Sequence, residues 1–170
     1  MPLTSALAVD LILLASALTL AWAAVGDAMT YRIPNILPAF VAAGFLAVAW
    51  FEPPAFLTGG VLTGLGVFGL GALLFARRLM GGGDVKLLAA TSLWCGPEQL
   101  TAFALVISVT AVSLALVMMS PLGRLLPAPP TRLAAGPEGF AAAARQPMPF
   151  GVAVAAGGLW LLSHYLVAPK

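Results

Sequence analysis

The stretch Gly81-Gly82-Gly83-Asp84-Val85-Lys86 decides how the rest of this sequence is interpreted. Three successive glycines lead directly into a carboxylate, and apolar segments lie on both sides of the stretch. Glycine has no side chain, so it permits backbone conformations and close approaches that other residues prevent. We therefore expect Asp84 to lie at the start of a helix, at the end of a flexible glycine strap that lets another chain approach.

The composition indicates an integral membrane protein. Of the 170 residues, 61% are hydrophobic and 8% are charged, whereas about 25% are charged in a typical globular domain. Because a soluble domain cannot bury that much apolar surface, we expect an all-α, polytopic bundle of membrane helices that forms a single domain over residues 1–170. With one cysteine and one histidine, the sequence offers no internal disulfide and no multi-cysteine zinc site.

Apolar segments predict about six membrane helices. They cover approximately residues 3–25, 36–51, 55–76, 85–95, 100–119 and 150–167. The fourth is short, since a spanning helix needs about 20 residues; it can extend back through the glycines, thin the bilayer or be re-entrant. Residues 21–23 resemble a signal-peptidase site, but no Lys or Arg precedes the first apolar run, so we expect that helix to be retained.

Polar stretches connect these segments. The expected loops on one side of the membrane are residues 26–35, 77–84 and 121–149. Within the last loop, residues 138–145 could form a short interfacial helix. In the third segment, Gly60 and Gly64 are four residues apart, a spacing that lets membrane helices pack closely.

The basic residues predict the orientation of the bundle. With six crossings and the N-terminus outside, the three loops lie on the cytoplasmic side, where basic residues accumulate. The loops and their edges hold all but one of the basic residues: Arg32, Arg77, Arg78, Lys86, Arg124, Arg132 and Arg145. Trp22, Trp50 and Trp94 fall near segment ends, so we expect them in an interfacial aromatic belt.

Two carboxylates are expected on the same side of the membrane. Asp27 follows one expected crossing and Asp84 follows three, and both numbers are odd. Two carboxylates in a low-dielectric setting can share one proton. One then acts as a base toward water while the other donates to a carbonyl, as in aspartic proteases. The helix N-terminus and Lys86 favour charge on Asp84, so we expect Asp84 ionised and Asp27 protonated.

These residues resemble the type IV prepilin peptidases, membrane aspartic proteases of the Gly-x-Gly-Asp type. The resemblance rests on Asp27 followed by Arg32-Ile33-Pro34-Asn35, on residues 81–87, and on residues 149–157, which resemble the family's last helix. It implies that Asp27 and Asp84 are catalytic and that no metal or cofactor takes part. The residues expected to support the site are Gly81, Gly82, Gly83, Lys86, Arg32, Pro34 and Asn35.

The resemblance also implies a substrate and a location. These enzymes remove the short basic leader of prepilins or pseudopilins at the cytoplasmic face of the bacterial inner membrane. The expected partners are therefore such substrates and the lipid bilayer, and not nucleic acid, with the N-terminus periplasmic. Larger members carry an N-terminal region with paired Cys-x-x-Cys motifs and methylate the new terminus. This sequence has no such region and resembles the short form associated with Flp or Tad pili, so methyl transfer is not expected.

Other interpretations stay open at this point. Intramembrane acids also build ion and proton paths, so the chain could be a small transporter, or an assembly subunit in which the acids are replaceable. Lys86 and Arg32 either contribute only to the positive-inside bias or also tune the aspartate pair.

Overall fold

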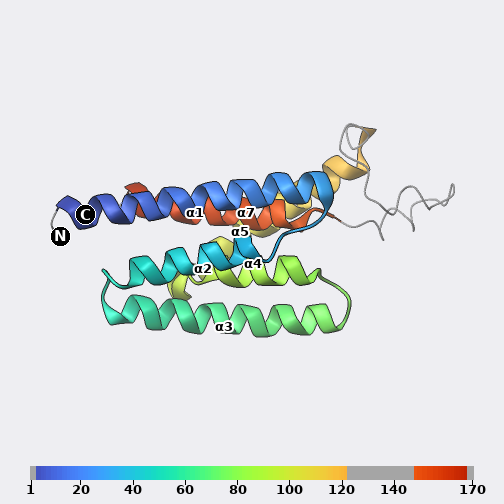
Figure 1. The fold of residues 1–170 in the computed structure, drawn as a ribbon. Coiled ribbons are helices and arrows are strands. Elements are labelled where there is room, and N and C mark those ends of the chain that lie inside the picture. Colours follow the sequence, from blue (N-terminus) through green and yellow to red (C-terminus); the bar gives the residue numbers. More distant parts are fainter. Residues whose placement is uncertain (1–2, 122–147, 168–170) are drawn as a thin grey trace.

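A computed structural model describes residues 3–121 and 148–167. This part of the chain is a bundle of helices, which confirms the expected all-α class (Figure 1). The helices are α1 (Leu3–Thr30), α2 (Ile36–Ala49), α3 (Pro54–Ala76), α4 (Gly82–Ser92), α5 (Gly96–Met119) and α7 (Phe150–Val167). The expected interfacial helix at residues 138–145 lies outside the described residues.

Four of the described helices, α1, α3, α5 and α7, are long and apolar enough to cross a membrane. The other two are shorter: α2 has 14 residues and α4 has 11. At about 1.5 Å per residue, they reach about 21 Å and 16 Å, less than the hydrocarbon core of about 30 Å. Because α4 packs against α2, α3 and α7, this short helix lies inside the bundle and brings its polar first turn there.

Two expected loops are partly helical in the structure. The expected loop 26–35 is reduced to residues 31–35, because α1 continues through Thr30, whose hydroxyl donates to the Gly26 carbonyl at 2.7 Å. Asp27 is therefore a helical residue. Helix α4 begins at Gly82, so two strap glycines of the expected loop 77–84 belong to its first turn.

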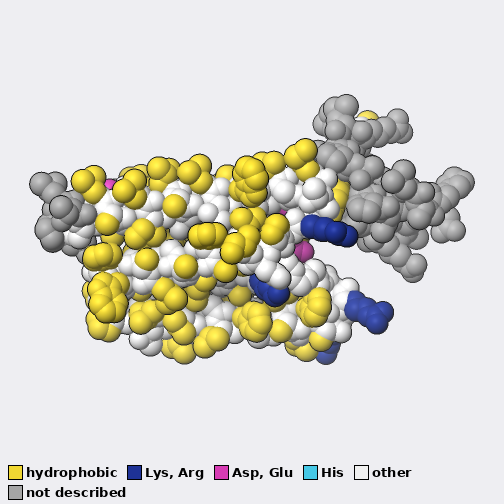
Figure 2. All heavy atoms as spheres, in the orientation of Figure 1, with side chains coloured by type: hydrophobic (Ala, Val, Ile, Leu, Met, Phe, Trp, Pro, Cys, Tyr) yellow, Lys and Arg dark blue, Asp and Glu magenta, His cyan; other side chains and the backbone are white. Residues whose placement is uncertain are grey.

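The segments that carry the two sequence motifs meet at one end of the bundle. Helices α1 and α3 both end there, and α4 begins there (Figure 1). Just after each of these two helices, a non-glycine residue adopts the left-handed backbone conformation: Tyr31 (φ 53°) follows α1 and Arg78 (φ 59°) follows α3. Lys and Arg side chains gather at this same end, while hydrophobic side chains cover the visible face along the helices (Figure 2).

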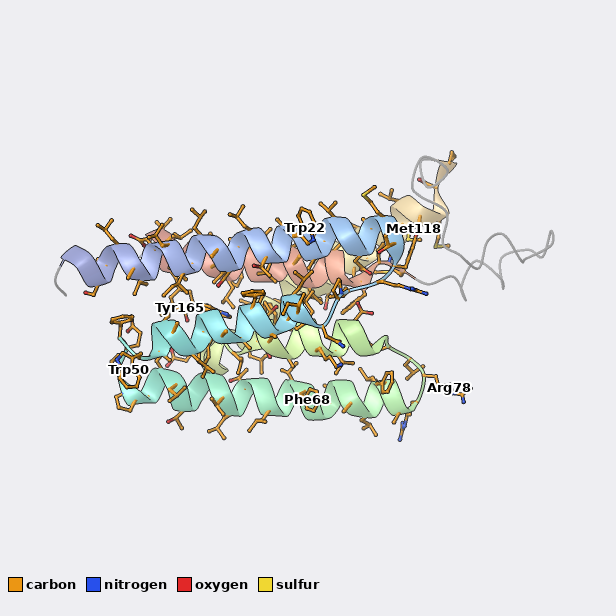
Figure 3. All side chains as sticks on the ribbon, in the orientation of Figure 1. Trp22, Trp50, Phe68, Arg78, Met118 and Tyr165 are labelled. Carbon is orange, nitrogen blue, oxygen red and sulfur yellow. The ribbon has the colours of Figure 1, made fainter. Side chains whose placement is uncertain are left out.

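The prediction that Trp94 lies in an interfacial belt is wrong. Trp94 is 1% exposed, and its ring contacts those of Phe45 and Tyr165 at centroid distances of 5.8 and 6.2 Å. The Tyr165 hydroxyl also donates to the Trp94 carbonyl at 2.7 Å. Since α4 ends inside the bundle, the end of this segment is not a membrane interface. Trp22 and Trp50, in contrast, point outward from the bundle (Figure 3).

The expected close packing at Gly60 and Gly64 is confirmed. A β-carbon at Gly60 would collide with the Leu93 carbonyl oxygen and the Phe45 ring, and one at Gly64 would lie 2.5 Å from Leu93 Cδ2. These glycines therefore let α3 lie against the residues that follow α4. Gly69, on the same helix, has no such neighbour, because nothing lies within 4 Å of its β-carbon position.

We predict that Gly60→Ala destabilises the bundle by about 1–3 kcal/mol, the usual cost of overpacking a core. The matched control, Gly69→Ala, should be neutral or slightly stabilising, because alanine favours a helix over glycine by up to about 1 kcal/mol. Unfolding midpoints in detergent measure both effects. Equal midpoints for the two variants would contradict the packing described here.

Candidate active site

Asp27 and Asp84 meet at the end of the bundle where the motif segments converge. Asp27 lies in the last turn of α1 and is 4% exposed, and Asp84 lies in the first turn of α4 and is partly buried. Helix α7 packs against both α1 and α4, so it links the two elements. The negative charge of Asp27 contributes to the raised pKa of Asp84, which places the two carboxyls within electrostatic range.

Asp27 is held by the start of α7. Its Oδ2 atom accepts the backbone N–H of Gly151 at 2.7 Å. Gly151 is the second residue of α7, where helical N–H groups have no partner within their own helix. A β-carbon at Gly151 would lie 2.8 Å from Asp27 Oδ2 and 2.6 Å from Ile33 Cδ1, so this contact requires a glycine.

Asp84 folds back onto the start of its own helix. Its carboxyl accepts the backbone N–H of Gly81, the N-cap residue of α4. This is the half of a capping box in which an acidic side chain in the first turn binds the N-cap amide. A β-carbon at Gly81 would lie 2.7 Å from Asp84 Oδ2. The first strap glycine therefore leaves room for the Asp84 carboxyl itself.

Gly82 and Gly83 also have neighbours within the chain. A β-carbon at Gly82 would lie 3.2 Å from the Phe75 ring, and one at Gly83 would lie 3.2 Å from Ile33 Cβ. The space beside these glycines is thus filled by the protein's own residues. This differs from the expectation that the strap leaves room for another chain beside Asp84.

Lys86 and Asn35 join the two motifs. The Lys86 ammonium group donates to Asn35 Oδ1 at 2.9 Å, which links α4 to the start of α2. Asn35 occupies the N-cap position of α2 but makes no side-chain cap bond. Arg32 and Pro34 are exposed in the 31–35 loop. The structure therefore brings Lys86, Asn35 and the glycines into the network around the aspartates and leaves the side chains of Arg32 and Pro34 at the surface.

Sequence analysis missed two residues of this network, Ile33 and Gly151. Ile33 was read only as part of the motif after Asp27, and Gly151 only as part of the last helix. Only two features of the sequence pointed to these residues. One is a glycine at the second position of α7, and the other is an apolar residue among polar neighbours in the 31–35 loop.

The pKa of Asp84 is raised from 3.8 to about 6. Burial is the largest cause, because it disfavours the charged carboxylate, and the charge of Asp27 adds to it. The Gly81 N–H bond acts in the opposite direction. The raised pKa of Asp84 does not support the expectation that Asp84 carries the charge of the pair. The Lys86 ammonium group donates to Asn35, and burial outweighs the Gly81 hydrogen bond in setting the pKa of Asp84.

The arrangement offers acid–base chemistry from two neighbouring carboxyls. Asp84, with a pKa of about 6, can hold a proton in mildly acidic solution, whereas Asp27 accepts a hydrogen bond from Gly151 through one oxygen. Within residues 3–121 and 148–167, no group of three or more His, Cys, Asp or Glu side chains is arranged to hold a metal ion.

Comparison with known protein families identifies a match over much of the chain. A profile of the type IV leader peptidase family matches residues 12–117. This region contains Asp27, Asp84 and both motifs, and it ends before α7. No match to a curated protein or to a solved structure was found.

We predict that Asp27→Asn lowers the pKa of Asp84 from about 6 toward 3.8, because the nearby negative charge is removed. The pKa should stay above 3.8, since burial is the larger cause. Carboxyl-labelled aspartate suits NMR titration in detergent, as the chain has only Asp10, Asp27 and Asp84. Asp10→Asn is the matched control. A pKa of Asp84 that is the same in both variants would show that the aspartates are not coupled.

Proposed function

The chain belongs to the type IV leader peptidase family, and on that premise we propose that it is an aspartic endopeptidase that removes the leader of type IV prepilins or pseudopilins. The observation that carries this proposal is the convergence of Asp27 and Asp84 at one end of a bundle whose long helices can cross a membrane. A pair of carboxyls is sufficient to activate water for peptide hydrolysis.

In the proposed reaction the two carboxyls share one proton, and one acts as the general acid while the other acts as the general base. Asp84 is protonated and donates to the carbonyl oxygen of the scissile peptide, because burial and the charge of Asp27 raise its pKa to about 6. Asp27 takes a proton from water, and the water oxygen bonds to the carbonyl carbon. The peptide C–N bond then breaks as the leaving amine receives the proton from Asp27, and a hydroxyl of the tetrahedral intermediate returns its proton to Asp84, which restores the starting state of the pair. The Gly151 N–H holds Asp27 Oδ2 in place at the start of α7.

The proposed substrate class matches the shape of the bundle. A prepilin has a charged leader followed by a hydrophobic helix, and that helix can lie in the bilayer beside the protein. The junction then reaches the end of the bundle where the carboxyls lie. Arg32, Arg77, Arg78 and Lys86 are exposed near that end. Under the positive-inside rule, this end faces the cytoplasm in the proposed orientation, and in the proposed bacterial inner membrane the N-terminus is periplasmic. The Flp or Tad type is part of the proposal.

A transporter or assembly subunit that uses the acids for ion or proton binding is the alternative. Transport sites lie near the bilayer midplane. Here Asp27 is in the last turn of α1 and Asp84 in the first turn of α4, both at the end of the bundle. This position and membership in a peptidase family favour hydrolysis.

The direct test is cleavage of a purified, epitope-tagged prepilin in detergent by the full chain. Asp27→Asn and Asp84→Asn should each lower turnover by about 10²–10⁴-fold, the usual contribution of a general acid or base. Asp10→Asn should cleave normally, since Asp10 lies near the opposite end of α1. Unfolding midpoints verify that each variant is folded. Full cleavage by either of the first two variants would exclude the two-aspartate mechanism.

The raised pKa of Asp84 predicts how activity depends on pH. Because Asp84 acts as the acid, kcat/KM should fall as the pH rises through about 6 and Asp84 loses its proton. The measurement is the initial cleavage rate at low substrate concentration between about pH 5 and 8, with the unfolding midpoint recorded at each pH as a control. A rate that rises steadily over this interval would assign the acid role to another group.

A further inference from the structure

Ile33 lies between the first turn of α4, which carries Asp84, and the first turn of α7, which binds Asp27 through Gly151. It is in the short loop between α1 and α2, and it is partly buried against the hydrophobic core. On one side it faces Gly83, the residue before Asp84. On the other it faces Gly151, whose amide binds Asp27. Ile33 supplies one or more of the three heavy atoms that lie nearest to the β-carbon position of each of these two glycines.

The backbone side of Ile33 packs against α4. The β-carbon position of Gly83 lies 3.2 Å from Ile33 Cβ, 3.4 Å from its carbonyl oxygen and 3.8 Å from its nitrogen. Any side chain at residue 83 would therefore push the loop away from the first turn of α4. Gly83 makes this close approach possible, and Asp84 is the next residue.

The side-chain end of Ile33 packs against α7 and lies beside Asp27. Its Cδ1 atom is 2.6 Å from the β-carbon position of Gly151, and Asp27 Oδ2 is 2.8 Å from the same point. The Ile33 methyl group and the Asp27 carboxylate therefore both lie beside the α-carbon of Gly151. An apolar group there covers the Gly151–Asp27 hydrogen bond from one side.

The loop that carries Ile33 is tied at both ends. At its start, the Tyr31 N–H donates to the Asp27 carbonyl at 2.9 Å, with Tyr31 in the left-handed region. At its end, Asn35 accepts from Lys86 of α4 at 2.9 Å. Both ties lead to helices that carry an aspartate, so the position of Ile33 is set by α1 and α4.

We propose that Ile33 is a positioning residue for the peptidase reaction: it holds the first turns of α4 and α7 at a fixed separation and keeps water from the side of Asp27 that binds Gly151. The proposal rests on the proposed function for its catalytic consequence. Its structural part concerns the spacing and hydration of the two carboxyls and can be measured without a substrate.

The test compares Ile33→Ala with Ile33→Val and with Ile36→Ala in the full chain. Ile36 is an apolar residue of the same type three positions away, at the start of α2, and it is 58% exposed. We expect Ile33→Ala to lower kcat on a tagged prepilin by about 10-fold or more, since small displacements of catalytic groups reduce rates steeply. Ile33→Val, which keeps the β-branch and loses Cδ1, should fall between Ile33→Ala and the unaltered chain. Ile36→Ala should leave kcat unchanged.

The second readout separates positioning from a merely structural role. In Ile33→Ala, water reaches the site, so the pKa of Asp84 should fall from about 6 when followed by NMR titration of labelled aspartates. Ile36→Ala should not change it. If Ile33→Ala is too unstable to measure, Ile33→Val gives the same comparison in a milder form. An unchanged pKa of Asp84 together with an unchanged kcat in folded Ile33 variants would overturn the proposal.

The two proposals fail in different ways. If Asp27→Asn still cleaves the prepilin, the peptidase mechanism is wrong, yet a shift of the Asp84 titration in Ile33→Ala still supports the positioning of the carboxyls. If Asp27→Asn is inactive and the Ile33 variants match the unaltered chain in both readouts, the mechanism stands and the role of Ile33 is wrong.

Discussion

The hydrogen bond from the Gly151 amide to Asp27 is the contact on which the site depends. A carboxyl that is 4% exposed in an apolar bundle is costly unless a donor satisfies it. The start of α7 supplies this donor, because the first N–H groups of a helix have no partner within it. The contact requires a glycine at residue 151, since a β-carbon would meet both Asp27 and Ile33. Helix α7 must therefore return to the end of the bundle where α1 ends.

The short helix α4 completes the arrangement. It is enclosed by α2, α3 and α7, and the glycines of α3 let it and its following residues pack closely. Burial of its first turn raises the pKa of Asp84, so the same packing that stabilises the bundle also prepares a carboxyl to hold a proton. The strap glycines serve this packing: Gly81 accommodates Asp84, and Gly83 accommodates Ile33.

Local patterns in the sequence were sufficient for much of this fold. Apolar runs located the helices, and the odd crossing numbers placed Asp27 and Asp84 at one end. Contacts between distant residues were not predictable, because nothing local links Gly151 to Asp27. The burial of Trp94 followed from α4 ending inside the bundle, which its length alone left undecided. The position of Lys86 was also not predictable: it was expected to favour a charged Asp84, and its ammonium group instead donates to Asn35.

The family match covers both aspartates, and the structure brings the helix ends that carry them to one end of the bundle. The most direct test of this central claim is chemical crosslinking of Asp27→Cys/Asp84→Cys in a Cys95→Ala background, where Cys95 is otherwise the one cysteine. A short bifunctional thiol reagent should join residues 27 and 84 in the folded protein, and it should not join residues 10 and 84 in the matched Asp10→Cys/Asp84→Cys control. Failure to join 27 with 84 in a folded protein, or equal joining in the control, would contradict the account.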